Sequence, residues 1–500
     1  PSKLGRTGFV QLTNPVGTDT KLNEIARVFM EITSGAGYYK VSKMKFNYKG
    51  DNTTDVEKFY LYHTTTPYFS SQEENKLCDL TLSGTELQIS NMPTDDKAKF
   101  RSGEHYFWVV ADLKSSAELK HKVTLQLPKD AVELQYYGDN GSPLATEDRK
   151  FPDTEQYDQS RYCRVYKCLA KEDFENNNPS WTLTDYWKIG EPVHDAALTK
   201  FKTAPTKAFN GKNVLATAQL YDNSEHVTEK GHLDGQYTDG LRFENTRATY
   251  SLSAGINAEF YRDIRFKARY CLNSTPDDKF RLVIITDKDE AHGIPRDIET
   301  VVWDNTTRTT MIGWNTLDVD LSLAATRNKK FRFRFEMETK EDEETQSGLF
   351  IDDIQILGDY IKKDIGIVKV EPPQDFPMSN ASKVKITVKN FGSEDITGGY
   401  IVYLTLNGKK TIHEQSGTLA KGAEQTIEIS GLELAPDPNK AAIANEKQLT
   451  VEVALSGDKE GATSGEKDDD KTNNVMSVRF YSFPVYEIEA HSATKKYPLN

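Results

Sequence analysis

The most constraining feature of this chain is a run of eight residues in which apolar and charged side chains alternate without exception. The run reads Phe331-Arg332-Phe333-Arg334-Phe335-Glu336-Met337-Glu338. Successive side chains of a β-strand point to opposite faces, so this run buries its apolar side chains on one face and carries charge on the other. The pattern predicts a strand whose charged face is solvated or pairs with ions.

Further stretches with strand character are spread along the whole sequence, whereas helix signals are few. The clearest are Val41 to Tyr48, Lys58 to His63, Tyr106 to Val110, Arg281 to Thr286, Lys383 to Asn390 and Tyr400 to Leu406. Asn407-Gly408 follows the last of these and is a strong hairpin signal. The sequence therefore predicts an all-β protein, with at most a short helix near 115–122.

The 500 residues are too many for one hydrophobic core, so we expect three β-sandwich domains in tandem. A small sandwich is expected over 1–130, a polar connector over 131–169 and a jelly roll over 170–360. An immunoglobulin-like domain of about seven strands is expected over 361–485. Residues 486–500 are expected to be a tail or a linker.

The charge balance excludes some partners. The net charge is −13, and no cluster of Lys and Arg with interleaved aromatic residues occurs. Nucleic acid is therefore a poor partner. No apolar run approaches the roughly 18 residues of a membrane span, so membrane insertion is not expected. The chain begins at Pro1 without an initiator Met, as a mature or trimmed fragment would.

Two acidic phrases suggest a cation site. Asp173-Phe174-Glu175 and Phe350-Ile351-Asp352-Asp353-Ile354 each combine apolar and carboxylate residues. If the two phrases lie side by side, their like charges need a cation or a proton to coexist. We predict a structural calcium ion held by Glu175, Asp352 and Asp353, with one of the two adjacent aspartates binding through its side chain. The alternative is that these carboxylates are solvated or hydrogen-bonded in turns.

Tryptophans of the middle region are candidates for a ligand surface. Trp187, Trp303 and Trp314 lie there, and aromatic rings stack on the C–H faces of sugars. We predict that these three side chains contribute to a carbohydrate-binding surface. The alternative is that each tryptophan belongs to the core.

No catalytic constellation is present, so no catalytic residue is predicted. The sequence contains no nucleophile elbow, P-loop or dinucleotide fingerprint. His226 and His232 fit no zinc spacing. Cys163 and Cys168 are close enough in sequence for a disulfide across a tight turn, with buried or unpaired thiols as the alternative.

Residues 170–358 resemble the MAM-like jelly rolls of secreted Bacteroidota proteins, which include cleaved-adhesin and choice-of-anchor modules. The resemblance rests on Asp173-Phe174-Glu175, Trp187-Lys188-Ile189-Gly190 and Gly348-Leu349-Phe350-Ile351-Asp352-Asp353-Ile354, in that order. It implies that the first and last strands of the jelly roll pair. The sequence departs from the family pattern at Ile285-Thr286-Asp287-Lys288-Asp289.

Two weaker resemblances flank the jelly roll. Gly103-Glu104-His105-Tyr106-Phe107-Trp108 resembles the small β-domain ahead of BNR-repeat neuraminidases. Asp364-Ile365-Gly366 and Val384 to Phe391 are similar to CARDB-type, immunoglobulin-like domains. The repeated aspartate boxes of a sialidase propeller are absent from the sequence. Such modules imply a secreted protein or one at the bacterial cell surface.

The sequence thus predicts a non-catalytic extracellular binding or adhesion protein. Its expected partner is a glycan or a host or cell-surface protein, bound by the jelly roll. One alternative is the accessory region of a larger secreted glycosidase or protease whose catalytic domain lies outside this chain. Another is a purely structural surface segment without a small ligand.

Overall fold

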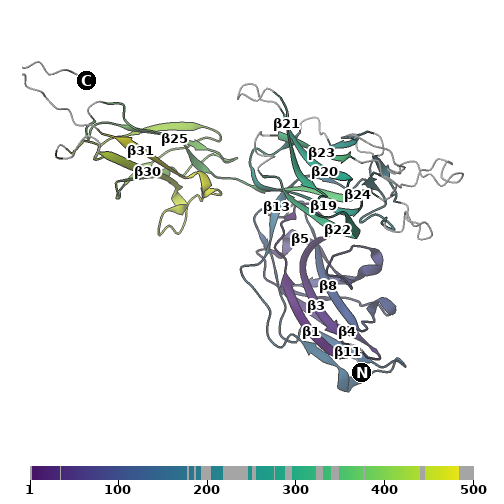
Figure 1. Ribbon diagram of the computed structural model, residues 1–500. Coiled ribbons are helices and arrows are strands. Elements are labelled where there is room, and N and C mark those ends of the chain that lie inside the picture. Colours follow the sequence, from purple (N-terminus) through teal and green to yellow (C-terminus); the bar gives the residue numbers. More distant parts are fainter. Residues whose placement is uncertain are drawn as a thin grey trace, which may run out of the picture. The chain divides into compact units, whose positions relative to one another are not determined.

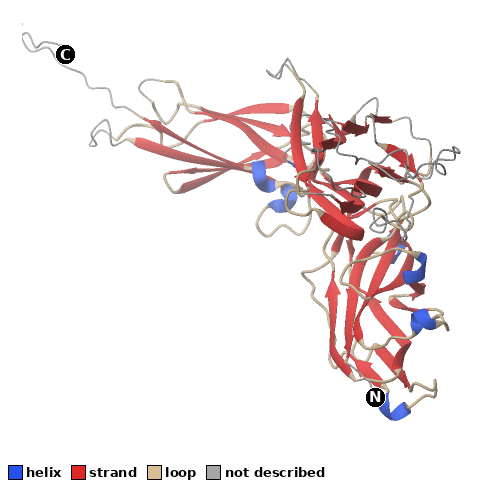
Figure 2. Cartoon of the chain, turned by 45° about the vertical axis from the view of Figure 1, so that its right-hand side comes forward, coloured by secondary structure: helices blue, strands red, loops and turns tan. Residues whose placement is uncertain are grey.

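The computed structural model describes most of the chain, and its regular elements are mainly β-strands (Figures 1 and 2). The described residues are 3–33, 35–176, 180–184, 187–192, 204–217, 246–250, 255–274, 276–287, 296–322, 330–338, 348–375, 378–437, 439 and 445–482. The predicted all-β fold built from β-sandwiches is confirmed. The chain divides into two compact units, Pro1–Tyr360 and Ile361–Asn500.

The first part of unit 1 is built on a ten-stranded sheet in the order β1-β3-β8-β5-β6-β7-β4-β11-β12, with β10 beside β4. The strands are β1 (Leu4–Gln11), β3 (Asn23–Ile32), β4 (Tyr38–Tyr48), β5 (Val56–Thr64), β6 (Lys76–Ser83), β7 (Glu86–Ile89), β8 (Gly103–Leu113), β10 (Leu125–Gln126), β11 (Val132–Tyr137) and β12 (Arg149–Phe151). Side chains of β3, β5 and β8 share one core with those of β4 and β11, which makes this part a sandwich. We call it the N-terminal sandwich.

The second part of unit 1 is the jelly roll, in which two sheets pack face to face. The six-stranded sheet contains β14 (Trp181–Leu183), β17 (Thr246–Tyr250), β18 (Ile256–Asn257), β20 (Lys279–Thr286), β21 (Ile298–Asp304) and β23 (Lys330–Glu338). The eight-stranded sheet contains β2 (Val16–Gly17), β9 (Lys122–Val123), β13 (Cys163–Glu172), β15 (Lys188–Gly190), β16 (Val214–Ala216), β19 (Tyr261–Asn273), β22 (Thr310–Asp320) and β24 (Gly348–Tyr360). Phe266 of one sheet meets Phe333 of the other, with ring centroids 5.3 Å apart.

The alternating run found in the sequence forms β23, in the interior of the six-stranded sheet. Phe331, Phe333, Phe335 and Met337 are buried in the jelly-roll core. On the opposite face, the Arg334 guanidinium donates to Glu336 at 2.7 Å and to Glu299 of β21 at 2.9 Å. The charged side chains of this face therefore form ion pairs with one another and with Glu299, which is one of the two predicted possibilities.

The N-terminal sandwich and the jelly roll share a sheet, so they are not structurally separate domains. In β13, Val165 pairs with Val16 of β2, and Cys163 pairs with Val123 of β9. A hydrophobic cluster joins Tyr62 and Trp108 of the N-terminal sandwich to Phe209 and Trp314 of the jelly roll. We call this joint the seam.

Three local expectations differ from the structure. Residues 131–169, expected as a connector, contain β11, β12 and most of β13, because their alternating apolar residues complete the first core. No helix forms over 115–122, where the chain makes turns and enters β9. A Cys163–Cys168 disulfide is excluded, since both residues lie in the extended strand β13, about 16 Å apart.

Unit 2 is a sandwich of a three-stranded and a four-stranded sheet, which matches the predicted seven strands. The first contains β25 (Ile365–Glu371), β26 (Val384–Asn390) and β29 (Glu424–Ile429), and the second contains β27 (Tyr400–Leu406), β28 (Lys409–Gln415), β30 (Glu446–Leu455) and β31 (Val475–Tyr481). Asn407 and Gly408, both at positive φ, make the tight turn between β27 and β28 that the sequence predicted. Apolar side chains of both sheets form one core.

Candidate ligand-binding site at the seam

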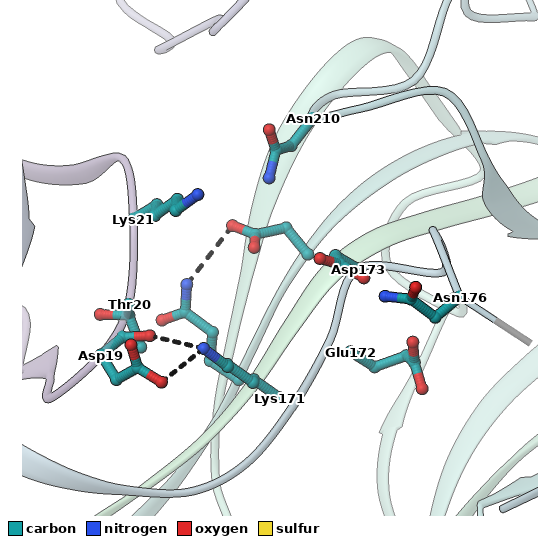
Figure 3. A pocket seen from close by; sticks show the side chains of 10 residues that line it. Asp19, Thr20, Lys21, Lys171, Glu172, Asp173, Asn176 and Asn210 are labelled. Atoms are coloured by element: carbon teal, nitrogen blue, oxygen red, sulfur yellow. Dashed lines mark hydrogen bonds and ion pairs between the residues drawn. The ribbon is translucent and has the colours of Figure 1, made fainter. Parts of the chain in front are cut away.

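A polar cavity of about 480 Å³ lies at the seam of unit 1 (Figure 3). We call it cavity 1. Its lining residues are Asp19, Thr20, Lys21, Lys171, Glu172, Asp173, Asn176, Asn210, Asp353 and Gln355. The lining contains carboxylates, amides and two lysines but no aromatic ring, so it suits a polar ligand.

Four parts of the chain position these side chains. The turn after β2 supplies Asp19, Thr20 and Lys21 from the N-terminal sandwich. The end of β13 with its following loop supplies Lys171, Glu172, Asp173 and Asn176. Asn210 belongs to the segment 204–213, and Asp353 and Gln355 belong to β24. β13 and β24 are the first and last long strands of the jelly roll, and Glu172 pairs with Ile354. The pairing implied by the family resemblance is confirmed.

Strained backbone is concentrated around this cavity. Asp19, Asp353, Phe174 and Leu22 have φ values of 58°, 49°, 58° and 54°. Non-glycine residues rarely adopt this left-handed region, and each instance costs on the order of 1–3 kcal/mol unless the surroundings impose it. Such strain is typical of functional sites, and here it turns the Asp353 carboxylate out of the regular strand alternation.

The electrostatics of cavity 1 are dominated by carboxylates. Burial, with a smaller contribution from the charge of Asp173, raises the pKa of Asp353 to about 6, while Arg269, Lys267 and a hydrogen bond from Gln355 oppose the shift. Lys171 is neutralised by Asp19, with 2.7 Å between Nζ and Oδ2. Figure 3 shows Lys21 across from Asp173 and Asn176, with Asn210 above the space between them. The cavity therefore attracts hydrogen-bond donors or a cation.

A second cavity, of about 330 Å³, adjoins the first along the seam. We call it cavity 2. It shares Lys21 and Asn210 with cavity 1, and its other lining residues are Leu22, Tyr60, Tyr62, Ser71, Gln72, Glu73, Lys76, Asp112, Lys207, Ala208, Phe209 and Gly211. In contrast to cavity 1, it contains aromatic rings. Tyr60 donates its hydroxyl hydrogen to Asp112 at 2.8 Å.

The segment 204–213 forms a wall of both cavities and is fastened on both sides of the seam. Towards the N-terminal sandwich, Ser71 Oγ donates to the Phe209 carbonyl at 2.5 Å, and Gln72 Nε2 donates to the Ala208 carbonyl at 3.3 Å. Towards the jelly roll, Trp314 Nε1 donates to the Lys207 carbonyl at 3.0 Å. These bonds hold the wall in place without a ligand.

The predicted metal-binding residues hold this same segment. Glu175 Oε1 accepts the backbone N–H groups of Lys212 and Asn213, both at 2.7 Å. Gly211, at φ 70°, lies so close to the Glu175 carboxylate that a Cβ there would be 2.4 Å from it. Asp352 is fully buried and accepts the N–H of Asn210 at 3.0 Å. Burial raises the pKa of Asp352 well above its usual range.

Of the three predicted calcium ligands, Asp353 alone lines cavity 1. Within the described part of the chain, no three acidic, histidine or cysteine side chains converge as a metal site would require. Residues 19–21 of the turn after β2 were missed by sequence reasoning. Nothing in that turn sequence shows that it faces residues more than 300 positions away.

The predicted sugar-stacking tryptophans lie in three different environments. Trp187 is 3 % exposed in the jelly-roll core, where its ring stacks on Phe335 at 6.1 Å. Trp314 is 6 % exposed at the seam. Trp303 is half-buried on β21 and packs edge-on against Tyr270. The rings of Trp187 and Trp314 are thus covered by protein, whereas part of Trp303 is open to solvent.

Comparison with known proteins adds the following. No family model matches the chain, and no curated protein matches it either. The family resemblances drawn from sequence motifs therefore stay predictions. In the described part of the chain, no helix combines the length and the apolar character needed to cross a membrane.

Several solved structures show a remote likeness. The tandem CBM22-1–CBM22-2 domain of Paenibacillus barcinonensis Xyn10C is 11 % identical, with 71 % of this chain and 93 % of that chain covered and a TM-score of 0.23. A structure of carbohydrate-binding modules of the β-sandwich superfamily is 10 % identical, with 71 % and 98 % covered and a TM-score of 0.25. A putative β-galactosidase from Bacteroides fragilis is 10 % identical, with 60 % and 40 % covered and a TM-score of 0.18. These scores are too low to carry any conclusion about ligand or activity.

Proposed function

We propose that unit 1 is the ligand-binding part of a non-catalytic extracellular binding protein, and that cavity 1 takes a polar, hydroxyl-rich ligand such as a carbohydrate. The observation that carries the proposal is the cavity itself. It has the volume of a small-molecule site, it is lined by carboxylates and amides, and it is held by strained backbone. Carboxylate and amide groups are the hydrogen-bond partners that sugar hydroxyls require.

The hydrogen bonds that fasten the segment 204–213 on both sides of the seam support the proposal. Binding costs less free energy when the site is already formed, because no loop needs ordering on binding. The fastened segment 204–213 and the shared strand β13 provide such a preformed site. The proposal includes a location of the protein at the cell surface and its adhesion to a partner that carries glycans.

A glycan array with the whole chain tests the proposal, followed by calorimetric titration of the glycans that bind. Asp353→Asn keeps the shape of the side chain and removes its charge, so we expect affinity to fall at least tenfold. Asp96→Asn is the matched control, because Asp96 is exposed and far along the chain from the cavity lining. Absence of binding to any glycan, or equal affinity of D353N and the wild type, would overturn it.

A structural calcium ion at cavity 1 is a second proposal, favoured by one observation. Asp173 and Asp353 lie close enough for the charge of Asp173 to raise the pKa of Asp353. A divalent cation bound by carboxylate and amide oxygens would relieve that repulsion. We expect calcium to raise the melting temperature of the chain by several degrees and D353N to abolish the effect. Identical melting in calcium and in excess chelator would refute it.

The alternative that this chain is the accessory region of a larger secreted glycosidase or protease is compatible with the same cavity. In that case the cavity would hold the substrate polymer near a catalytic domain elsewhere in the polypeptide. Fusion of a catalytic domain to this chain in its gene would favour the alternative over a stand-alone adhesion protein.

A further inference from the structure

The lining of cavity 1 carries more negative than positive charge. Four of its residues have carboxylates and two are lysines. Lys171 is engaged by Asp19, since its Nζ lies 2.7 Å from Oδ2 and 3.0 Å from the carbonyl oxygen of that residue. Among the described lining residues, this leaves Lys21 to balance the three other carboxylates. One of these three, Glu172, is buried and both of its oxygens accept hydrogen bonds, so two carboxylates remain for a ligand.

These two carboxylates belong to Asp173, which is exposed, and Asp353, which is half-buried. One oxygen of Asp173 accepts a backbone N–H at 3.2 Å, and one oxygen of Asp353 accepts a side-chain N–H at 3.3 Å. The other oxygen of each has no hydrogen-bond partner within the described part of the chain. The nearby cations are engaged elsewhere, because Arg269 pairs with Glu24 and Lys267 donates to a backbone carbonyl at 3.0 Å. Each carboxylate can therefore accept from a ligand.

The charges of Asp173 and Asp353 repel each other. A protonated amine between them would attract both, because it carries a positive charge together with three N–H donors. A neutral hydroxyl supplies a donor without the charge, and a uronic acid would add a third negative charge. The lining therefore favours a cationic ligand over a neutral one, and a neutral ligand over an anionic one.

The rest of the lining indicates what carries the amine. All the lining side chains are polar, and the cavity has about 480 Å³. The lysine side chain of a peptide would bring a stem of methylene groups for which this lining has no apolar cover. A sugar ring instead presents hydroxyls, which the amides of Asn176 and Asn210 can bind. Figure 3 shows Asn176 beside Asp173, with Asn210 above the space.

We infer that the ligand of cavity 1 is an amino sugar with a free amine, whose ammonium group lies between Asp173 and Asp353. This inference rests on the proposed function and deepens it by naming the class of sugar. The corresponding polymers are polysaccharides in which some or all of the amino groups lack acetyl groups. Neutral and uronic acid-rich polysaccharides are the classes that the cavity disfavours.

The first test compares three trisaccharides on the wild-type chain by calorimetric titration. The β-1,4-linked trimers of glucose, N-acetylglucosamine and glucosamine are matched probes, because they differ at C2 by a hydroxyl, an acetamide and an amine. Just below neutral pH, where most of the sugar amine is protonated, we expect the glucosamine trimer to bind at least tenfold more tightly than the other two. Added salt should weaken the binding of the glucosamine trimer alone, since it screens charges.

Three outcomes of this comparison would overturn the inference and leave the proposed function standing. They are equal affinities for the three trimers, binding of other glycans alone, and tighter binding of Nα-acetyl-lysine methylamide than of the glucosamine trimer. Absence of binding to any glycan would overturn both. The titrations are made in excess chelator, because a divalent cation would compete for the same carboxylates. A requirement for calcium would therefore also contradict the ammonium contact.

The second test uses a variant that keeps the shape of the lining. Asp173→Asn should lower affinity for the glucosamine trimer at least tenfold and leave affinity for the glucose trimer within about twofold. Asp96→Asn is the matched control, because Asp96 is exposed and lies outside the lining. Thermal melting of both variants verifies folding. An equal loss of affinity for both trimers in D173N, or no loss for either, would contradict the assignment of the amine to this carboxylate pair.

Discussion

His63 and His105 form a buried pair in the N-terminal sandwich. Nε2 of His105 lies 2.6 Å from the Arg101 carbonyl and therefore carries a hydrogen, which leaves Nδ1 to accept from Nε2–H of His63 at 2.9 Å. Burial lowers the pKa of His63 to about 3, and His105 adds to the shift. Burial also lowers the pKa of His105. Both rings are therefore neutral in the folded protein.

The first prediction follows from this pair. An unfolded histidine titrates near pH 6.5, so the unfolded chain takes up protons first as the pH falls. The stability contribution of His63 is complete above about pH 6.5 and is lost from there towards pH 3, at up to about 1.4 kcal/mol per pH unit. His63→Gln keeps a donor to His105 without titrating, so its unfolding free energy should fall less steeply between pH 6.5 and 4. Urea denaturation at several pH values measures both slopes, and parallel slopes would contradict the prediction.

Arg269 of β19 lies at the seam and pairs with a residue of the N-terminal sandwich. Its Nη1 lies 2.6 Å from Glu24 of β3, and its guanidinium lies over the rings of Phe209 and Phe69 at 4.5 Å and 5.3 Å. Arg269 is 7 % exposed, so the ion pair is largely shielded from water.

The second prediction concerns this ion pair. Arg269→Met should destabilise unit 1 by about 3 kcal/mol, because Glu24, whose side chain is 13 % exposed, is left as a largely shielded charge without its partner. The double variant R269M/E24Q should recover part of that loss, since the uncompensated charge is gone. Chemical denaturation of both variants and of E24Q alone completes the double-mutant cycle. A loss in R269M that E24Q does not relieve would show that packing, and not charge, governs the contact.

At the scale of elements, the segment 204–213 depends on Glu175 in the loop that follows β13. Glu175→Ala removes the acceptor of two backbone N–H groups, and we expect a loss of about 2 kcal/mol and faster trypsin cleavage after Lys207 or Lys212. Glu191→Ala is the control, because the Glu191 carboxylate makes a surface pair with Lys212, 3.2 Å from Nζ, and such pairs contribute little. The loss of stability and the faster cleavage in E175A should persist in excess chelator. If chelation instead removes the difference from the wild type, Glu175 acts as a calcium ligand.

The elements show which parts of the structure the sequence could predict. The period of β23 and the turn after β27 are local properties, and both are observed as predicted. The bulge that places Asp353 at φ 49° is not local, because it depends on the register shift where β24 meets Lys267 to Arg269 of β19. The roles of Asp352 and Glu175 at the segment 204–213 depend on contacts more than 35 residues away in sequence. No periodicity encodes such contacts.

At the scale of the whole molecule, the two units have separate cores. We predict that a fragment of residues 361–482 folds alone and melts cooperatively. A fragment of residues 1–130 should not fold, because it lacks β11, which pairs with β4 along six positions and buries Val132, Leu134 and Tyr136. Circular dichroism with thermal melting measures both fragments, and residues 1–360 serve as the positive control. A cooperative transition in 1–130 would contradict the prediction.

Two short strands of the N-terminal region, β2 and β9, belong to the eight-stranded sheet of the jelly roll, and this has a practical consequence. Val16 and Val123 lie beside β13 as part of the same hydrogen-bonded layer. An engineer who transplants the jelly roll into another polypeptide as a cassette must carry the first 169 residues with it. Recombination at the boundary near residue 170 would expose an open β-edge and invite aggregation of the graft.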